Sequence, residues 1–414
     1  FEALYKANNS GTSGLSEIPT AYDYIRLGHP LSCILEWGMA HFHKLKPESV
    51  ISFSSQTVPV LAVLRKNLME KRKTQILYTG KLPHFFDAEV IQKVYGYSFD
   101  LKQIEKDGPI PIFDGSTVFI TQEDGCGKTN LPTEVDFYIS LYDNIGSVLI
   151  INGEKNESYT SEIQHVRRRE TIAMTPANSL VALQSLVQNA TFEKKESAVE
   201  ANHASVLRSV KEITGSTTKA LIASSGLSMQ YAIMMGLIHD ALENHKGKAI
   251  KFIVPPNCYG GTNDQARRVA ACIDNVEVVD LPVDGDNDMV QSIDIVLNKI
   301  AKQDAVPYII AEIPTNPRVE VPNLEKLKDV LSKERQTPTG AKAIDPVFIL
   351  DQTFCPNVHF LGENDILSSV RTISYVSGSK FPSGGKCTAG YCVGNKKTEG
   401  LMSKIEEHLN LCDN

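Results

Sequence analysis

Short apolar runs alternate with helix-length amphipathic stretches through the second half of the chain. Runs rich in β-branched side chains predict strands over 220–223, 250–254, 276–281, 308–313, 347–350 and 372–376. Apolar spacing between these runs predicts helices over 228–243, 264–273, 289–301, 324–332 and 364–370. Such alternation predicts an α/β fold with a mostly parallel sheet covered on both faces. Ligands of such sheets bind at the carboxyl ends of the strands.

The first half is less regular. Strands are predicted over 50–54, 117–121 and 147–152, and a helix is predicted on each side of the first. Residues 153–170 are polar and end in three arginines, so we interpret them as a linker or exposed loop with a solvated arginine run. We divide the chain into an N-terminal α/β region (1–170), a large domain (171–395) and a C-terminal segment (396–414).

Two stretches of the chain resemble each other. VISFSSQTVPVLAVL (50–64) and ALIASSGLSMQYAIM (220–234) both consist of an apolar strand, a Ser-Ser turn and an apolar helix. Many strand–turn–helix units share this pattern. The alternative is that the N-terminal region is a degenerate duplicate of the same half-domain, and the sequence leaves both interpretations open.

Charge and cysteine usage exclude several classes of protein. The chain has 42 Lys+Arg against 49 Asp+Glu, and a formal net charge of -7 does not fit a nucleic-acid binder. No apolar run approaches the roughly 18 residues that a membrane span needs. The eight cysteines lack zinc-site spacing and are too sparse for a disulfide scaffold. We therefore expect no metal and a reducing, cytoplasmic compartment.

Small and polar residues follow the predicted strands of the second half. Ser225 and Gly226 precede a helix, whose free N–H groups and dipole attract phosphate. Tyr259, next to two glycines, offers an aromatic face on which a flat ligand can stack. Each feature also has a structural explanation, which is helix capping for the serine and core packing for the tyrosine.

Two charged residues complete this set. Asp351 follows a buried strand, where a carboxylate is costly unless a cation such as a protonated ring nitrogen meets it. Lys380 ends a loop of small residues, as expected of a lysine that binds an aldehyde. A proline-stiffened loop adds Asn316. Pyridoxal phosphate needs a phosphate cradle, a stacking aromatic, an acid for its ring nitrogen and an amine for its aldehyde.

The order and wording of these motifs resemble the Cys/Met-metabolism pyridoxal-phosphate enzymes. This family includes cystathionine γ-synthase, cystathionine lyases, methionine γ-lyase and O-acetylhomoserine sulfhydrylase. Its motifs Ser-Ser-Gly-Met, Tyr-Gly-Gly-Thr, Glu-x-Pro-Thr-Asn-Pro, Asp-Asn-Thr-Phe and Ser-x-Thr-Lys correspond here to SSGL, YGGT, EIPTNP, DQTF and SGSK. The resemblance covers about 200–395. It implies an aspartate aminotransferase-like large domain that binds pyridoxal phosphate.

The resemblance also implies a role for each matched residue. Lys380 would hold the cofactor and move protons, and Asp351 would keep the ring nitrogen protonated. Tyr259 would stack on the ring and assist the leaving group, and Asn316 would face the ring hydroxyl. The remaining cofactor-binding positions that we carry over, mostly for phosphate, are Ser225, Gly226, Leu227, Thr353, Ser377 and Ser379.

A further match lies far upstream. Tyr24-Ile-Arg26-Leu-Gly-His29-Pro30 follows the family pattern Tyr-x-Arg-x-x-Asn-Pro, with His for Asn. In the family this Tyr and Arg reach the phosphate of a neighbouring subunit, which predicts a homo-oligomer, either a dimer or a tetramer. The family spacing leads here to Ser54–Ser55, whereas Ser224–Gly226 lies much later. Either a long insertion separates the parts, or residues 17–66 are a degenerate duplicate.

The resemblance favours an enzyme that acts on small amino-acid substrates. The first choice is γ-replacement on an O-acylhomoserine with cysteine to give cystathionine, and the long N-terminal region resembles the fungal type of cystathionine γ-synthase. The alternatives are a C–S lyase, an O-acetylhomoserine sulfhydrylase and a non-catalytic subunit. The family continues into a smaller C-terminal domain with an Arg for the substrate carboxylate, and we expect that domain to be absent from this sequence.

Overall fold

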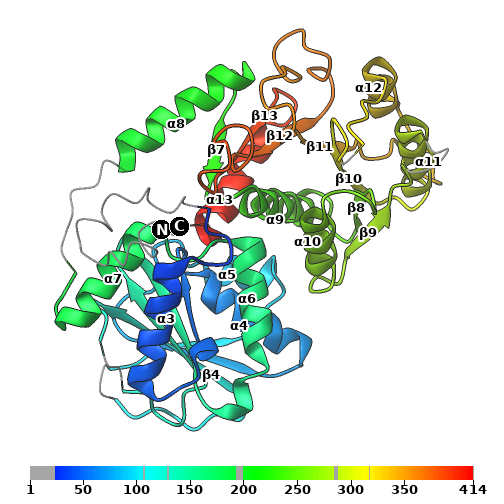
Figure 1. Ribbon diagram of the computed structural model, residues 1–414. Coiled ribbons are helices and arrows are strands. Elements are labelled where there is room, and N and C mark those ends of the chain that lie inside the picture. Colours follow the sequence, from blue (N-terminus) through cyan, green and yellow to red (C-terminus); the bar gives the residue numbers. More distant parts are fainter. Residues whose placement is uncertain are drawn as a thin grey trace.

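The computed structural model describes residues 24–105, 108–127, 130–192, 199–283, 288–316 and 318–413. In these residues the strands form two mixed sheets, one in each half of the chain, and helices pack against both (Figure 1). The predicted α/β class is confirmed. Most neighbouring strands of the sheet in the C-terminal half are parallel, as the alternating pattern predicts.

The N-terminal sheet has six strands in the order β1-β6-β5-β4-β2-β3. The strands are β1 (Val50–Phe53), β2 (Thr74–Tyr78), β3 (Asp100–Gln103), β4 (Ser116–Glu123), β5 (Phe137–Tyr142) and β6 (Gly146–Ile151). β6 is antiparallel to both neighbours, and the other pairs are parallel. Its helices are α3 (Pro30–His43), α4 (Val58–Met69), α5 (Ala88–Lys93), α6 (Tyr159–Glu170) and α7 (Pro176–Gln188), with short 3₁₀ turns at Pro47–Ser49 and Glu154–Asn156.

The interpretation of 153–170 as a linker or exposed loop is wrong. Most of this segment forms α6, which packs against α4. Arg167 is buried, pairs with Glu36 at 2.6 Å and donates to the carbonyl oxygen of Ser52 at 3.0 Å. The segment looks polar because paired charges, as well as apolar side chains, fill its buried face.

The C-terminal sheet has seven strands in the order β7-β13-β12-β11-β10-β8-β9. The strands are β7 (Ala220–Ala223), β8 (Ile250–Val254), β9 (Val276–Asp280), β10 (Val306–Glu312), β11 (Val347–Asp351), β12 (Thr372–Ser377) and β13 (Gly390–Gly394). Its helices are α8 (Val199–Thr214), α9 (Gly226–Asn244), α10 (Gly260–Ala270), α11 (Met289–Ala301), α12 (Leu324–Ser332) and α13 (Met402–Cys412), with a 3₁₀ turn at Glu399–Leu401. Residues 364–370 form turns, so the helix predicted there is wrong.

The boundaries at 170 and 395 remain predictions. Helix α7, just after the first boundary, packs against α3 of the N-terminal half. Helix α13, just after the second, packs along α9. Both segments are therefore integrated with the helices around the two sheets.

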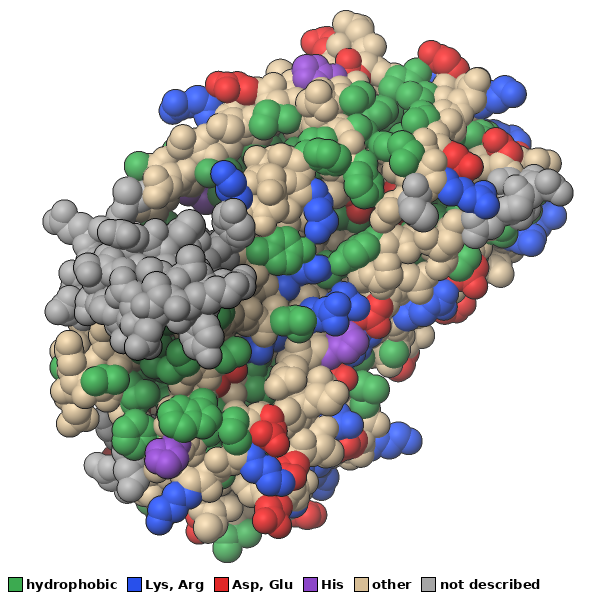
Figure 2. Space-filling view, viewed as in Figure 1, with side chains coloured by type: hydrophobic (Ala, Val, Ile, Leu, Met, Phe, Trp, Pro, Cys, Tyr) green, Lys and Arg blue, Asp and Glu red, His purple; other side chains and the backbone are tan. Residues whose placement is uncertain are grey.

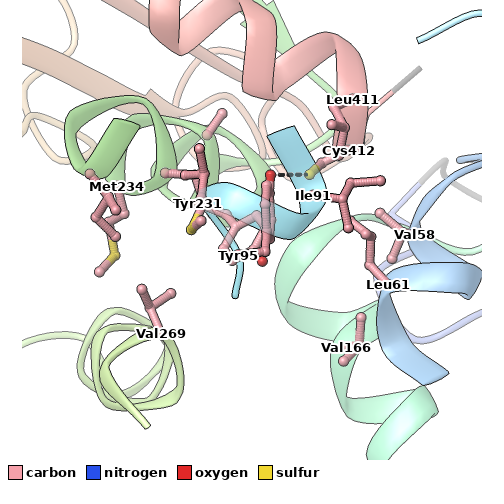
Figure 3. Close-up of a cluster of buried hydrophobic side chains, with 14 of the residues drawn as sticks. Val58, Leu61, Ile91, Tyr95, Val166, Tyr231, Met234, Val269, Leu411 and Cys412 are labelled. Carbon is pink, nitrogen blue, oxygen red and sulfur yellow. Dashed lines mark hydrogen bonds between the residues drawn. The ribbon is translucent and has the colours of Figure 1, made fainter. Parts of the chain in front are cut away.

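Buried apolar side chains run continuously from one half to the other (Figure 3). Tyr95 of the N-terminal half packs near Tyr231 of α9, with ring centroids 6.4 Å apart. The Tyr95 hydroxyl lies 3.0 Å from His408 Nδ1 and 3.3 Å from Cys412 Sγ, both on α13. Because burying such apolar area stabilises by roughly 25 cal/mol per Å², this shared core holds the two halves together.

The surface carries both charge signs. Figure 2 shows acidic and basic side chains interspersed over the face in view. Within the described ranges, every helix is too short or too polar to span a lipid bilayer.

Candidate active site

One cavity lies at the carboxyl ends of several strands of the C-terminal sheet, and its empty volume, which includes space open to solvent, is about 740 Å³. All the predicted site residues line it: Tyr24, Arg26, Ser225, Gly226, Leu227, Tyr259, Asn316, Asp351, Thr353, Ser377, Ser379 and Lys380. Our assignment of site residues missed five further lining residues, which are Gln230, Thr262, Glu312, Phe354 and Tyr375. Most of the predicted residues lie at the ends of strands or in the loops that follow them, where sequence motifs can be recognised.

The start of α9 forms one wall of the cavity. Ser225 caps the helix, because its side chain accepts from the Ser228 N–H at 3.0 Å, so the capping explanation holds for this residue. A Cβ at Gly226 would lie 2.7 Å from Cβ and 2.9 Å from Cα of Ser377. Only glycine allows this approach, which brings the helix N-terminus and the end of β12 to the same spot. A helix N-terminus favours an anion.

Asp351 lies at the end of β11 and is buried. Its carboxylate accepts from the Thr353 N–H at 3.0 Å and from the Tyr375 hydroxyl at 2.9 Å. Burial raises the pKa of Asp351, and the hydrogen bonds from Thr353 and Tyr375 oppose the shift. Among the described residues, no Lys or Arg side chain pairs with it. A ligand that carries a positive charge would therefore relieve the desolvation of this carboxylate.

Two polar side chains connect Asp351 to the opposite wall. The Tyr375 hydroxyl lies 2.9 Å from Gln230 Oε1 on α9. Thr262 of α10 donates to the same oxygen at 2.9 Å. Sequence motifs do not mark Gln230 and Tyr375, because they lie within a helix and a strand rather than in the following loops.

Glu312, at the end of β10, holds the loops that carry Tyr259 and Asn316. Its two carboxylate oxygens accept from the backbone N–H groups of Tyr259 at 2.6 Å and Asn316 at 3.2 Å. Burial raises the pKa of Glu312 to about 7; the Tyr259 N–H lowers it, and the Asp351 charge raises it. Glu312 therefore positions the aromatic ring and the carboxamide.

Two cations from different halves of the chain meet at the mouth of the cavity. Lys380 Nζ donates to the Tyr24 hydroxyl at 3.0 Å, and Arg26 Nη1 donates to the Tyr259 hydroxyl at 2.7 Å. Burial raises the pKa of Tyr24, but Lys380 and Arg26 outweigh this effect and lower it. Tyr24 and Arg26 thus line a cavity of their own chain, whereas the family resemblance implies contact with a neighbouring subunit.

Gln352, which replaces the family's Asn, is absent from the described lining. Its amide donates to the carbonyl oxygen of Cys355 at 2.8 Å and accepts from the Ser374 hydroxyl at 2.8 Å. These contacts hold the turn after β11. The replacement of Asn by Gln therefore affects a residue that supports the cavity wall and does not line the cavity itself.

No protein-family model matches the chain, and a search of curated proteins also finds no match. Among solved structures, the chain is similar to MetB from Corynebacterium glutamicum, with 17% identity, a TM-score of 0.36 and coverage of 54% of each chain. It is also similar to cystathionine gamma-lyase from Lactobacillus plantarum complexed with L-serine, with 19% identity, a TM-score of 0.36 and coverage of 50% of this chain and 45% of that one.

A third structure is the gamma lyase CalE6 from Micromonospora echinospora, with 15% identity and a TM-score of 0.36. The match covers 53% of this chain and 48% of that one. The chain thus spans about half the length of the structures that it matches.

Proposed function

We propose that this chain is a pyridoxal-phosphate enzyme of sulfur amino-acid metabolism, and that it replaces the γ-substituent of an O-acylhomoserine with cysteine to give cystathionine. The observation that carries the cofactor assignment is that Lys380, Asp351, Tyr259 and the N-terminus of α9 line one cavity. The family motifs of the sequence carry the choice of reaction.

The residues of the cavity fit the chemical groups of the cofactor. The first N–H groups of α9 and the hydroxyls of Ser377 and Ser379 offer donors for its phosphate. Asp351 offers a buried carboxylate to the ring nitrogen, and Lys380 offers an amine to the aldehyde. Because Gly226 has no side chain, the first turn of α9 and Ser377 can lie close together beside the proposed phosphate position.

Bound pyridoxal phosphate supplies an electron sink for the substrate. Asp351 would hold a proton at the ring nitrogen, which keeps that sink effective. Lys380 would take a proton from a substrate carbon and return it. The Tyr24 hydroxyl, 3.0 Å from Lys380 Nζ, is placed to exchange a proton with it. Tyr259 would orient the substrate against the ring.

Two related reactions that use the same kind of site are the second candidates. A C–S lyase or an O-acetylhomoserine sulfhydrylase would use the same cofactor residues. The common location of Lys380, Asp351 and Tyr259 favours a catalyst over a non-catalytic subunit. The proposal includes an amino-acid substrate. It also includes a homo-oligomer, which the family resemblance implies, although Tyr24 and Arg26 contact the cavity of their own chain.

The test is a set of parallel assays on the purified chain with added pyridoxal phosphate. We expect cystathionine from O-succinyl- or O-acetylhomoserine only when cysteine is present. Cystathionine alone and methionine alone test the lyase alternatives, and sulfide in place of cysteine tests the sulfhydrylase. Lys380→Ala is the negative control. Absence of product in every assay, with no cofactor bound, would contradict the proposal.

A further inference from the structure

The two sheets share one topology. In each, the first strand lies at one edge (β1 or β7) and pairs antiparallel with the last strand (β6 or β13). The last strand in turn pairs antiparallel with the strand before it, β5 or β12. In both sheets the remaining neighbouring strands pair in parallel. The second and third strands of each half, β2 and β3 or β8 and β9, lie at the other edge of the sheet. The N-terminal sheet differs by having one strand fewer.

The flanking helices follow the same plan. Helices α3 and α8 precede the first strands, α4 and α9 follow them, and α6 and α13 follow the last strands. A Ser-Ser turn starts both α4 and α9, and Ser55 accepts from the N–H of Val58 as Ser225 accepts from that of Ser228. The resemblance between 50–64 and 220–234 thus extends to the whole arrangement. The N-terminal half therefore has the arrangement of the C-terminal half, with one strand fewer.

The N-terminal half lacks an equivalent of the loop that carries Lys380. In the C-terminal half, β12 and β13 are joined by residues 378–389, which include Lys380. In the N-terminal half, only Asp143–Ile145 separate β5 from β6, so there is no loop for a lysine. Gln56 replaces Gly226 and donates to the carbonyl oxygen of Tyr142 at 3.1 Å.

The N-terminal half reaches the cavity of the C-terminal half through its leading segment. Tyr24 and Arg26, just before α3, contact Lys380 and Tyr259 of the C-terminal half. At the end of β5, the position that corresponds to the end of β12, the ring of Phe192 packs on Tyr142 instead, with ring centroids 5.2 Å apart. Phe192 follows α7, so this contact lies within the N-terminal half.

We propose that the N-terminal half is an internal partner, which lacks a counterpart of the Lys380 loop in its described residues and contributes to the site of the C-terminal half in the same chain through Tyr24 and Arg26. The identity of the ligand rests on the proposed function, but the intrachain contact does not. Each chain therefore builds one cavity from both of its halves, and Arg26 offers the bidentate donors that suit a phosphate.

The test uses the photoreactive residue p-benzoylphenylalanine at position 24 of the full chain. Because the Tyr24 hydroxyl contacts Lys380, irradiation should link position 24 to the 378–389 loop in a product of monomer mass. The matched control carries the same residue at position 112, where the Ile112 side chain is 96% exposed, and should not label this loop.

Two results would overturn the proposal. One is a covalent dimer in which position 24 of one chain is joined to the loop of another. The other is irradiation that leaves the 378–389 loop unlabelled. Neither result depends on the cofactor, so a failure of the proposed reaction and a failure of the internal-partner model can be told apart.

Discussion

Arg65 connects the two halves, and its replacement tests how they dock. Its side chain is only 3% exposed, and its Nη1 lies 3.2 Å from Glu170 Oε1. Its Nη2 donates across the junction to the carbonyl oxygen of Arg268 at 2.8 Å. Burial raises the pKa of Glu170, while Arg65 and then Arg268 lower it. Arg65→Met would therefore leave a buried carboxylate without its main partner.

The contacts of Glu170 indicate how much stability the Arg65→Met variant should lose. Removing one partner of a buried ion pair costs about 3–5 kcal/mol. Arg268 Nη2 remains 4.0 Å from Glu170 Oε1, so we expect the lower end, about 3 kcal/mol at pH 8. Without Arg65 the folded-state pKa of Glu170 rises further above its unfolded value. The loss should therefore be fully developed at high pH and shrink as the pH falls and Glu170 becomes protonated.

Urea unfolding of Arg65→Met at pH 8 and pH 5 measures this effect. The double variant Arg65→Met/Glu170→Gln has no unpaired charge and should regain most of the lost free energy of unfolding. Lys93→Met, which removes an exposed pair with Glu89, is the control and should leave the free energy of unfolding nearly unchanged. An Arg65→Met variant as stable as this control, or a double variant no more stable than the single one, would refute the reasoning.

Three further predictions concern the cavity. Asp351→Asn should retain cofactor but lower kcat by about 10²–10³-fold, because a charge-assisted hydrogen bond is lost in a desolvated site, and near-normal turnover would contradict this. Gly226→Ala should weaken pyridoxal-phosphate binding measured by fluorescence titration, because its Cβ would meet Ser377 at 2.7 Å, whereas Gly400→Ala, which has open space, should bind normally. Because burial raises the pKa of Glu312 to about 7, the folded state keeps a proton that the unfolded chain releases near 4.5, so the free energy of unfolding should fall as the pH rises from about 4.5 to about 7. Glu312→Gln should flatten that slope in urea titrations, and an unchanged slope would assign it to other groups.

The sequence pattern predicted the C-terminal sheet well because its central strands are buried on both faces. Such strands are continuous apolar runs, as in β11, and their loops carry the motifs of the site. β13 was missed, since two glycines bound a run of only three residues. Helix α6 was missed because Arg167 and Glu170 are buried as paired charges, and a polar segment resembles a loop when its partners are unknown.

The sequence allowed us to predict which residues line the cavity more fully than how the chain brings them together. Strand-end motifs marked Asp351 and Lys380 as candidates, and both line the cavity, whereas Gln230 and Tyr375 lie inside elements and have no motif. The position of Tyr24 depends on how the two sheets dock. Local sequence patterns report the period and the ends of elements, but they do not report this long-range packing.

The most direct test of the central claim is the attachment point of the cofactor. The purified chain would be incubated with pyridoxal phosphate, reduced with borohydride, digested and mapped by mass spectrometry. We predict one equivalent per chain, attached to Lys380, with no attachment in Lys380→Ala and normal attachment in Lys386→Ala, a lysine of the same loop. Attachment at another lysine, or the absence of any stable adduct, would contradict the assignment of this cavity as a pyridoxal-phosphate site.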